Sequence, residues 1–384
     1  MKIKKQLNTI FLMPNDAILF LIFYSYFMLI NARISETKME QHSRKPSSTS
    51  IMQVGTGFWA SKVLLGAVKL ELFTKLAEKK SMSAYEIKSS LKLNCTDRNL
   101  FDFLDTLTTF GFLEREGLLD TAVYSNNINT DFFLDKKKLT YIGGMLEMLN
   151  NRLYDIWGNF EEALLTGRPQ SEAKNGGNFF ETLYSDTVKL KEFMHYMSGL
   201  QMENFILLAQ SFDFSKYKTL VDIGGSAGLL SLMVAKSHFH MSCISWDLPP
   251  VALIANEVIE SYQLQDRVKT SCGDFFKDEF PKADIITMGN ILHDWDEKIK
   301  LMLFKKAYDA LPEGGVFIAI ENVIDDERKN NAGGLLMSLN MLVETGTGFD
   351  YTFADFNIWS KETGFKSTSI IPLSGPTSAA IAFK

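Results

Sequence analysis

One short stretch, VDIGGSAG at residues 221–228, constrains the fold of this chain more than any other. An apolar run of β-strand composition, residues 219–223, leads into this glycine-rich turn, and the helical pattern LLSLMVAK follows it. A strand, a glycine turn and a helix in this order are typical of an α/β fold, in which the turn presents backbone N–H groups to a ligand. We therefore expect a ligand site where this first strand ends.

The spacing of the glycines excludes the two common phosphate-binding motifs. If Gly225 and Gly228 are the last two glycines of G-x-G-x-x-G, Ile223 occupies the position of the first, and no Gly-Lys-Ser/Thr follows to complete a P-loop. An acid in the turn would repel a pyrophosphate but suits a cationic ligand, and the common cationic ligand here is S-adenosylmethionine. We expect this cofactor to be bound around Asp222, Gly224, Gly225 and Gly228.

Strand-like and helical runs alternate from Thr219 onward. This alternation predicts a Rossmann-like, mostly parallel seven-stranded sheet covered by helices. The last two strand-like runs, STSII and AAIAF, are joined without a helical segment, which predicts an antiparallel hairpin at the edge of the sheet. In such a fold the ligand lies over the carboxyl ends of the strands, so the residues found there are candidates for the site.

Acidic residues follow the second and third of these strands as well. Asp247 stands nineteen residues beyond Gly228, close to the spacing at which an acid accepts hydrogen bonds from ribose hydroxyls. Gly273, Asp274 and Phe275 end the third strand, where the carboxylate suits an adenine amino group and the ring can stack on the base. Any one acid has a helix cap as its alternative interpretation, but three in register favour a cofactor site.

The fourth strand ends just before His293, the only one of the five histidines at an expected strand end. Glu321 ends the fifth strand, the usual neighbour of the fourth, where it can accept the second imidazole N–H and fix the tautomer. A structural role is the ordinary interpretation of a lone histidine. Methyl transfer from a sulfonium needs a nucleophile, however, and a phenol with a pKa of about 10 needs a base to become one. This pairing makes His293 a candidate general base.

The first folded segment, residues 51–135, has the pattern of a winged helix. Apolar residues recur with helical spacing over 58–77, a short helix is expected over 83–91, and Thr96 is a candidate N-cap for a third helix. The stretch GFLEREGLLDTAVYS then predicts a β-hairpin that turns at Glu116-Gly117.

DNA binding is the obvious function for such a shape, but the charges disfavour it. The third helix carries Asp97, Arg98, Asp102 and Asp105, a negative set where a recognition helix is positive. The formal net charge of −6 gives no basic face for nucleic acid either. A dimerisation module is therefore the favoured interpretation. Residues 136–210 are expected to be a helical connection whose aromatic and Met side chains either pack as core or line an apolar substrate pocket, and 211–384 to bind the cofactor.

Residues 1–50 differ from the rest of the chain. MKIKK precedes an apolar run over residues 17–30, and a Ser-rich linker follows over 41–50. Fourteen helical residues span about 21 Å, short of the roughly 30 Å of hydrocarbon in a bilayer. A signal peptide, a membrane anchor and a leader ahead of a start at Met39 or Met52 stay open. The cysteines Cys95, Cys243 and Cys272 show no C-x-x-C spacing, which favours a reducing, cytoplasmic compartment.

The motifs resemble the small-molecule O-methyltransferases of the plant caffeate and bacterial polyketide type, and most of all the acetylserotonin (hydroxyindole) enzymes. Six segments carry the resemblance in order: VDIGGSAG, WDLPPV, GDFFKD, ILHDWDE, LPEGGVFIAIE and SLNMLVET. It covers about residues 52–384. It implies a homodimer that transfers the methyl group of S-adenosylmethionine, without a metal, to a hydroxyl of a small aromatic acceptor.

The resemblance also implies roles for single residues. His293 would be the base with Asp294 beside it, Glu321 would orient it, and Asn340 would reach the substrate. Trp157, in YDIWGNFEEAL, matches the helix that closes over the cofactor, and the WDLPPV segment places Leu248 in the cofactor site next to Asp247.

Two positions depart from the family pattern. Where the family usually has Gly-x-Glu-Arg-Thr, this chain has GFDYT at residues 348–352, so the second orienting acid, Asp350, is one methylene shorter. Glu344 stands where the hydroxyindole enzymes have a glutamine, and a carboxylate there alters what the substrate site will hydrogen-bond. The acceptor stays open, and an inactive homologue with a binding or regulatory role is the alternative to an active enzyme.

Overall fold

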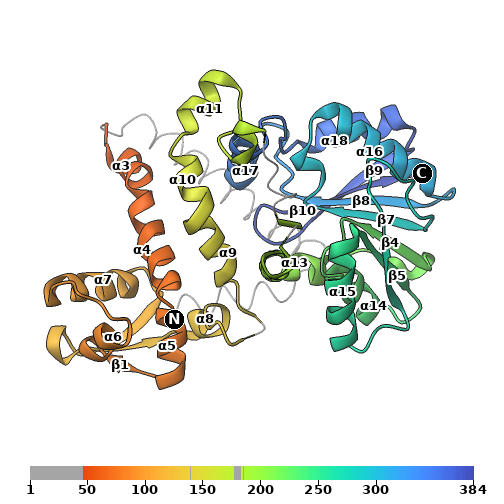
Figure 1. The fold of residues 1–384 in the computed structure, drawn as a ribbon. Helices are drawn as coiled ribbons and strands as arrows, with labels where there is room; N and C mark the ends of the chain where they lie inside the picture. The colour runs from red at the N-terminus through yellow and green to blue at the C-terminus, as the bar shows by residue number, and fades with distance from the viewer. Residues whose placement is uncertain (1–45, 139, 177–182, 185) are drawn as a thin grey trace, which may run out of the picture. The chain divides into compact units, whose positions relative to one another are not determined.

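The computed structural model describes residues 46–384 apart from 139, 177–182 and 185 (Figure 1). The expected leader with its apolar run over 17–30 lies outside the described residues. The chain divides after Ala60 into two compact units, Met1–Ala60 and Ser61–Lys384. The domain boundaries expected near residues 50, 135 and 210 stay predictions.

The N-terminal part of the described chain consists of helices and a three-stranded antiparallel sheet of order β1-β3-β2. Helices followed by a hairpin confirm the winged-helix-like arrangement. The elements are α3 (Thr49–Gly55), α4 (Gly57–Lys69), α5 (Leu72–Lys79), β1 (Met82–Ser83), α6 (Ala84–Ser90), α7 (Asp97–Thr109), β2 (Leu113–Glu116), η1 (Leu119–Thr121), β3 (Val123–Asn126) and α8 (Ile128–Phe133).

Local sequence accounts for most of these boundaries. Thr96 is the N-cap of α7, where its side chain accepts a hydrogen bond from the amide of Asn99 at 3.2 Å. The single helix expected over 58–77 is wrong, because Glu71 adopts a left-handed backbone with φ of 57° and separates α4 from α5. A left-handed residue interrupts the helical hydrogen bonds but leaves the apolar spacing unchanged, so periodicity does not reveal it.

Within the described residues, one helical stretch, Thr49–Lys69, is long and apolar enough to cross a membrane by length and composition. Core helices of soluble proteins and signal sequences have the same properties, so this is weak support for a membrane span.

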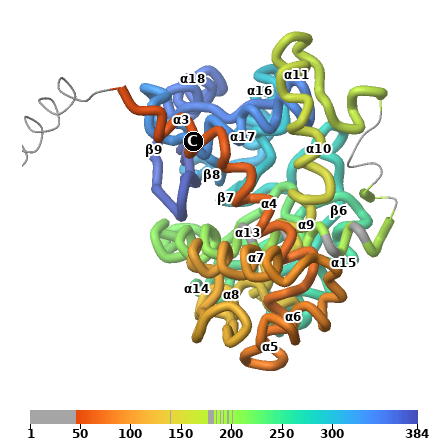
Figure 2. Tube along the Cα trace, turned by 90° about the vertical axis from the view of Figure 1, so that its left-hand side faces the viewer, coloured from red at the N-terminus to blue at the C-terminus, as the bar shows by residue number. Residues whose placement is uncertain are grey.

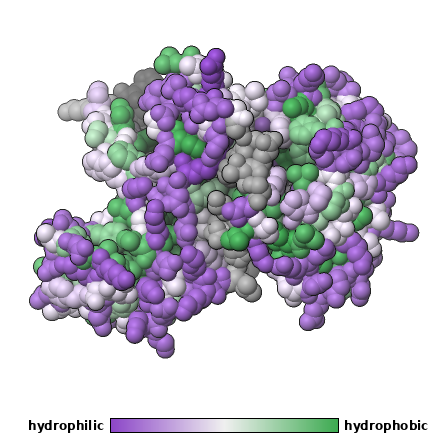
Figure 3. Space-filling view, viewed as in Figure 1, coloured by the Kyte–Doolittle hydropathy of each residue, from purple (hydrophilic) through white to green (hydrophobic). Residues whose placement is uncertain are grey.

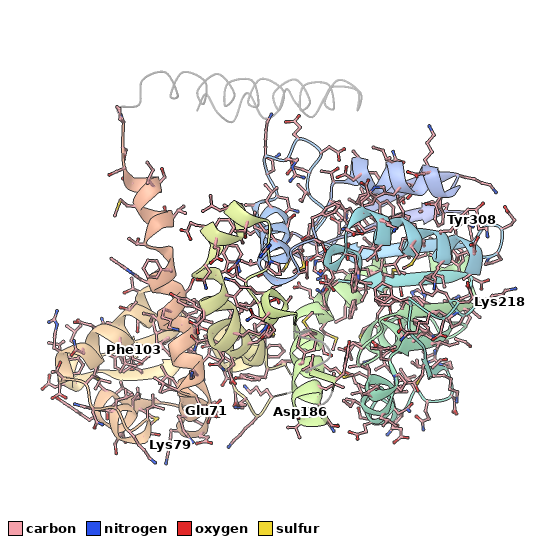
Figure 4. All side chains as sticks on the ribbon, turned by 45° about the horizontal axis from the view of Figure 1, so that its top comes forward. Glu71, Lys79, Phe103, Asp186, Lys218 and Tyr308 are labelled. Carbon is pink, nitrogen blue, oxygen red and sulfur yellow. The ribbon has the colours of Figure 1, made fainter. Side chains whose placement is uncertain are left out.

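A helical region lies between this part and the large sheet in the sequence. Its elements are α9 (Gly143–Met148), the π-helical turn η2 (Leu149–Leu153), α10 (Tyr154–Trp157), α11 (Phe160–Thr166), η3 (Glu172–Asn175) and the long α13 (Thr187–Ser211). Asp186, directly before α13, is labelled in Figure 4. Helix α13 contacts both α9 and α14.

The large sheet has seven strands in the order β6-β5-β4-β7-β8-β10-β9. The first five strands in this order, from β6 through β5, β4 and β7 to β8, run parallel. Strands β10 and β9 form the antiparallel hairpin at the edge, so the predicted fold is confirmed. Figure 2 shows β7 beside β8. The strands are β4 (Thr219–Ile223), β5 (Ser242–Asp247), β6 (Val268–Cys272), β7 (Ile285–Gly289), β8 (Val316–Glu321), β9 (Ser367–Pro372) and β10 (Ser378–Phe383).

Helices cover both faces of this sheet (Figure 1). Alternate strand residues such as Leu220 and Ile318 join one core with α13, α14 (Leu229–Ser237) and α15 (Pro249–Ser261). Their neighbours Val221 and Phe317 face the other core, with α16 (Glu297–Ala310) and α18 (Phe353–Thr363). The two-residue period of a strand therefore produces two separate cores. Figure 4 labels Lys218, which directly precedes β4, and Tyr308, which lies on α16.

The strand order decides where a ligand can bind. The chain adds β5 and β6 on one side of β4 and then returns to place β7 on the other side. Ligands of open parallel sheets bind at such a reversal, beyond the carboxyl ends of the strands. The glycine turn after β4 and the segment after β7 both lie at this edge.

Candidate active site

The glycine turn after β4 packs tightly against its neighbours. A side chain on Gly224 would come within 2.5 Å of the Ile291 side chain, and one on Gly225 within 2.4 Å of Ser245 Oγ. The amides of Gly224 and Gly225 donate to the carbonyl of Trp246 at 2.9 and 3.2 Å. The expectation that these N–H groups face a ligand is therefore wrong, because they bind β5. Glycine is needed here for close approach and, at Gly224 and Gly228, for positive φ.

Asp247 ends β5 with its carboxylate held by backbone amides. Its Oδ2 accepts from Ser226 in the glycine turn at 2.9 Å, and its Oδ1 accepts from Leu248 at 2.7 Å. Burial raises the pKa of Asp247 to about 6, although these two hydrogen bonds oppose the shift. The carboxylate is thus fixed in orientation and is stabilised further by any ligand that donates a hydrogen bond to it.

Asp222 lies inside the sheet rather than at its end. Its Oδ1 accepts a hydrogen bond from Thr287 Oγ1 on β7 at 2.7 Å. Burial, with a smaller contribution from the charge of Asp247, raises the pKa of Asp222 to about 7. The buried Asp222 and the partly buried Asp247 next to the glycine turn make this edge of the sheet favourable for a cation.

At the end of β6, the third predicted strand, Asp274 contacts residues that are close to it in the sequence. A side chain on Gly273 would collide with the ring of Trp246 at 2.0 Å, so glycine is required there. Asp274 pairs with Lys277 at 2.8 Å and accepts from the amide of Phe276, and these contacts lower its pKa. Phe275 packs edge-on against Trp295, with ring centroids 5.9 Å apart.

His293 lies in the single turn η5 (Leu292–Asp294), which follows β7. It is 7% exposed, and each ring nitrogen faces a carboxylate. Nδ1 is 3.5 Å from Asp350 Oδ1, and Nε2 is 3.6 Å from Asp294 Oδ1. Burial lowers the pKa of His293, but the carboxylates of Asp294, Asp350 and Glu321 together raise it to about 10. The arrangement holds a proton well and supports an imidazolium.

Glu321 does not hold the imidazole, contrary to expectation. Its Oε1 accepts hydrogen bonds from the backbone amides of Ile291 and His293 at 3.0 and 3.1 Å. The reason is geometric, because η5 turns the main chain, rather than the ring, over the end of β8. Glu321 therefore fixes the backbone of the histidine turn, and burial raises its own pKa.

Asp350 takes the position beside the ring that Glu321 was expected to fill. Its segment lies against the histidine turn because Gly348 has no side chain, where a Cβ would lie 2.5 Å from the carbonyl oxygen of His293. The amide of Asp350 donates to Ser338 Oγ of α17 (Ala332–Glu344) at 3.2 Å. The close approach of the main chain compensates for the shorter side chain.

The three remaining predicted residues meet in one network between α10 and α17. Trp157 Nε1 donates to Asn340 Oδ1 at 2.8 Å, and Asn340 Nδ2 donates to Glu344 Oε1 at 2.6 Å. Arg152 completes the network, since Nη1 binds Glu344 Oε2 at 2.6 Å and Nη2 binds Glu172 at 2.8 Å. Glu344 thus shares the Arg152 charge with Glu172, and both ends of the Asn340 amide are engaged.

The sequence matches two family descriptions. An O-methyltransferase domain covers residues 157–366, and an O-methyltransferase dimerisation domain covers residues 52–136. The chain belongs to the O-methyltransferase family.

Individual relatives agree with this assignment. The enzyme is 34% identical to the tetracenomycin polyketide synthesis 8-O-methyl transferase TcmO of Streptomyces glaucescens over 346 residues, 90% of this chain and 99% of that protein. It is 29% identical to acetylserotonin O-methyltransferase of Bos taurus, over 87% of this chain and 97% of that protein. The structure of human N-acetylserotonin methyltransferase has the same fold, with a TM-score of 0.80, 24% identity, and coverage of 89% of this chain and 99% of that one.

The enzyme uses S-adenosylmethionine, and the residues at the sheet edge fit that molecule. The cofactor has a cationic sulfonium and ammonium and a ribose with two donating hydroxyls. Asp222 offers a buried carboxylate and Asp247 a partly buried one, and desolvation raises the pKa of both, so a nearby cation or donor would stabilise them. Inside the described ranges, no group of three or more His, Cys, Asp or Glu side chains is arranged to hold a metal ion.

Sequence reasoning missed three residues of this O-methyltransferase. Arg152 and Lys300 are basic residues in helical segments, and nothing in their spacing connects them to Glu344 or to the histidine turn. Tyr184 is partly buried near the charges of Asp247 and Asp294, and its burial raises its phenol pKa. Only the folded chain brings these residues to the site.

Proposed function

We propose that this O-methyltransferase methylates a hydroxyl of a small aromatic acceptor, with His293 as general base. The observation that carries the proposal is the buried imidazole between Asp350 and Asp294, at the same sheet edge as the glycine turn. A phenol has a pKa of about 10 and is a poor nucleophile at neutral pH until a base removes its proton.

The cofactor would be held by residues at the ends of β4, β5 and β6. S-adenosylmethionine supplies an electrophilic methyl group when bound. Asp247 would accept hydrogen bonds from the ribose, Leu248 and the glycine turn would pack on the nucleoside, and Phe275 would stack on the adenine beside Asp274. The backbone-fixed carboxylate of Asp247 supports this assignment most directly.

The base would act through Nε2, the nitrogen on the side of Asp294. Asp350 would stabilise the positive ring through Nδ1, and Glu321 would hold the turn in place through its main-chain contacts. Because neighbouring carboxylates raise the pKa of His293, the ring is protonated at neutral pH. It must release this proton before it can act as a base. The positive charge of the bound cofactor lowers that pKa, because like charges oppose protonation.

Acceptor recognition would involve the network on α17. Trp157 stacks on Phe160, with centroids 5.3 Å apart and planes 17° apart, and this pair offers a flat apolar surface. Because Arg152 pairs with Glu344, this carboxylate already has a cationic partner without an acceptor. The relatives named above act on a polyketide and a hydroxyindole by their names, which supports a flat phenolic or hydroxyindole acceptor here. A histidine still flanked by its acids supports an active enzyme over an inactive homologue.

Replacement of the base tests this proposal. We expect His293→Ala to lower turnover by about 10²- to 10⁴-fold toward the best acceptor in a panel of phenols, hydroxyindoles and hydroxyquinones, with product-cofactor affinity nearly unchanged. His240→Ala, an exposed histidine elsewhere, is the matched control. The wild-type rate should rise with pH, because the neutral imidazole is the active form, and should persist in EDTA. Full activity of the His293 variant, or loss of the wild-type rate in EDTA, would refute the mechanism.

We also propose that the enzyme is a homodimer that works in the cytoplasm. The dimerisation domain over residues 52–136 supports the first statement. The three cysteines, all free, fit the reducing compartment in the second.

A further inference from the structure

Lys300 on α16 is a buried cation that the proposed mechanism does not use. Its relative exposure is 0%, although lysine is rarely buried fully without a partner. Burying an ammonium group costs several kcal/mol unless nearby groups compensate for the lost hydration. Its contacts therefore indicate what the charge does there.

The Lys300 ammonium touches two segments that carry site residues. Nζ donates a hydrogen bond to the carbonyl of Trp295, the residue after Asp294. Nζ also lies 3.5 Å from the ring centroid of Phe349, the residue before Asp350, and 6.0 Å from that of Trp359 on α18. The side chain thus joins the segment of His293 and Asp294 to the segment of Asp350 by one hydrogen bond and one cation–π contact.

The Lys300 ammonium is surrounded by the charges of several carboxylates. Burial lowers the pKa of Lys300 to about 8, and the carboxylates of Glu321, Asp350, Asp294 and Asp296 oppose this shift. The charges that act on His293 or Lys300 come from several elements: Asp294 on η5, Asp296 at the start of α16, Glu321 on β8 and Asp350 before α18. Two further ionisable groups lie one step away, since Glu344 on α17 acts on Asp294, and Tyr351 is affected by Glu321 and Asp350.

We propose that Lys300 is a positioning residue for the general base: it holds Asp350 and Asp294 on either side of His293 and offsets part of their negative charge. The inference rests on the proposed role of His293. It goes beyond that role, because Lys300 contacts the segments that carry the acids and would act through them.

The charge has a consequence that a purely structural lysine would not have. Without it, the surplus of carboxylates around His293 increases, and the imidazolium becomes more stable. The acid limb of the kcat/KM profile should then move to higher pH by about one unit. At pH values below the pKa, the neutral fraction of His293 falls about tenfold for each pH unit. The variant should therefore lose about tenfold in kcat/KM at neutral pH, and this loss should shrink as the pH rises.

The experiment compares pH–rate profiles of four variants in the full chain. Lys300→Met keeps the length of the stem, and Lys300→Gln keeps a donor for the Trp295 carbonyl; both remove the charge. Lys300→Arg retains it. Lys305→Met on the same helix is the matched control, since its ammonium is exposed and pairs with Asp309. Calorimetry with S-adenosylhomocysteine confirms that each variant is folded and binds the product.

We expect the acid limb of both uncharged variants to move upward, and that of the Arg and Lys305 variants to stay at the wild-type position. An unmoved limb in either folded uncharged variant, or a loss of equal size at every pH, would overturn the proposal. Failure of the proposed base is a separate result, because His293→Ala would then retain activity and the wild-type limb would not depend on His293.

Discussion

His293 has an acid at each ring nitrogen, but the two acids differ in their surroundings. Asp350, next to Nδ1, is 2% exposed, whereas the Asp294 side chain, next to Nε2, is 19% exposed. Burial raises the pKa of Asp294 to about 6, and the histidine opposes this shift. The Nδ1 side is thus suited to hold the ring, and the Nε2 side to exchange a proton with an acceptor.

At the residue scale, Asp247 allows a direct test of cofactor binding. Asp247→Asn keeps the shape and one oxygen acceptor but removes the charge that would receive two ribose hydroxyls. We expect about 10- to 100-fold weaker binding of S-adenosylhomocysteine, or about 1.4 to 2.8 kcal/mol, by calorimetry. Wild-type affinity should also fall as pH drops through about 6, where Asp247 becomes protonated. Unchanged affinity in Asp247→Asn would remove Asp247 from the site, and Asp266→Asn, at an exposed acid away from the site residues, serves as the control.

Sequence reasoning identified candidate residues better than their partners. His293 and Asp294 lie in the turn after β7, as the motifs suggested, and Asp350, in the segment before α18, meets them there. The partner of the imidazole was misassigned, because the choice between Glu321 and Asp350 depends on how η5 turns within three residues. Such a turn leaves no periodic pattern in the sequence.

At the scale of elements, the helical region and α17 are joined by the ion pair of Arg152 and Glu344. Removing only the cation leaves a half-buried carboxylate beside Asn340, which costs more than the pair contributes. We expect Arg152→Gln to raise the KM for the acceptor about tenfold with little change in cofactor affinity. Adding Glu344→Gln should recover most of this loss, because the unpaired charge is gone.

A double-mutant cycle measures this coupling through KM and kcat for each variant. If the effects of the two substitutions simply add, the ion pair does not shape the acceptor site. Lys174→Gln, which breaks an exposed pair with Glu162 nearby, gives the background for a surface contact.

Regular elements were predictable where one physical signal dominates. The inner strands β4, β7 and β8 stand where continuous apolar runs occur, because their residues face a core on each side, whereas the edge strands β6 and β9 are more polar and partly exposed. The break at Glu71 and the engaged amides of the glycine turn depend on single backbone conformations, which composition does not encode.

At the scale of the whole molecule, the dimerisation domain carries exposed apolar side chains. Met52, Val54 and Trp59 on α3 and α4 are exposed, Trp59 by 62%, and Figure 3 shows hydrophobic residues among hydrophilic ones over these helices. We expect light scattering to report a dimer and Trp59→Glu to weaken it. Two lost side chains per dimer correspond to about 3 to 6 kcal/mol.

Leu253→Glu on α15 is the matched control, because Leu253 is also exposed but lies outside the dimerisation domain. It should leave the dimer intact. A monomeric wild type at micromolar concentration, or equal effects of the two substitutions, would show that α4 does not form the interface.

The hairpin at the edge of the sheet has a consequence for the order in which the protein can be completed during synthesis. Strand β10 is the last in sequence, yet it lies between β8 and β9, with Ser378 opposite Glu321. Until the ribosome has released residues 378–383, the free edge of β8 has no neighbour on that side, and the acid that holds the histidine turn stands at that edge. A nascent chain would thus contain almost every site residue and still lack a finished sheet, so truncation or slow translation near this hairpin should favour aggregation over activity.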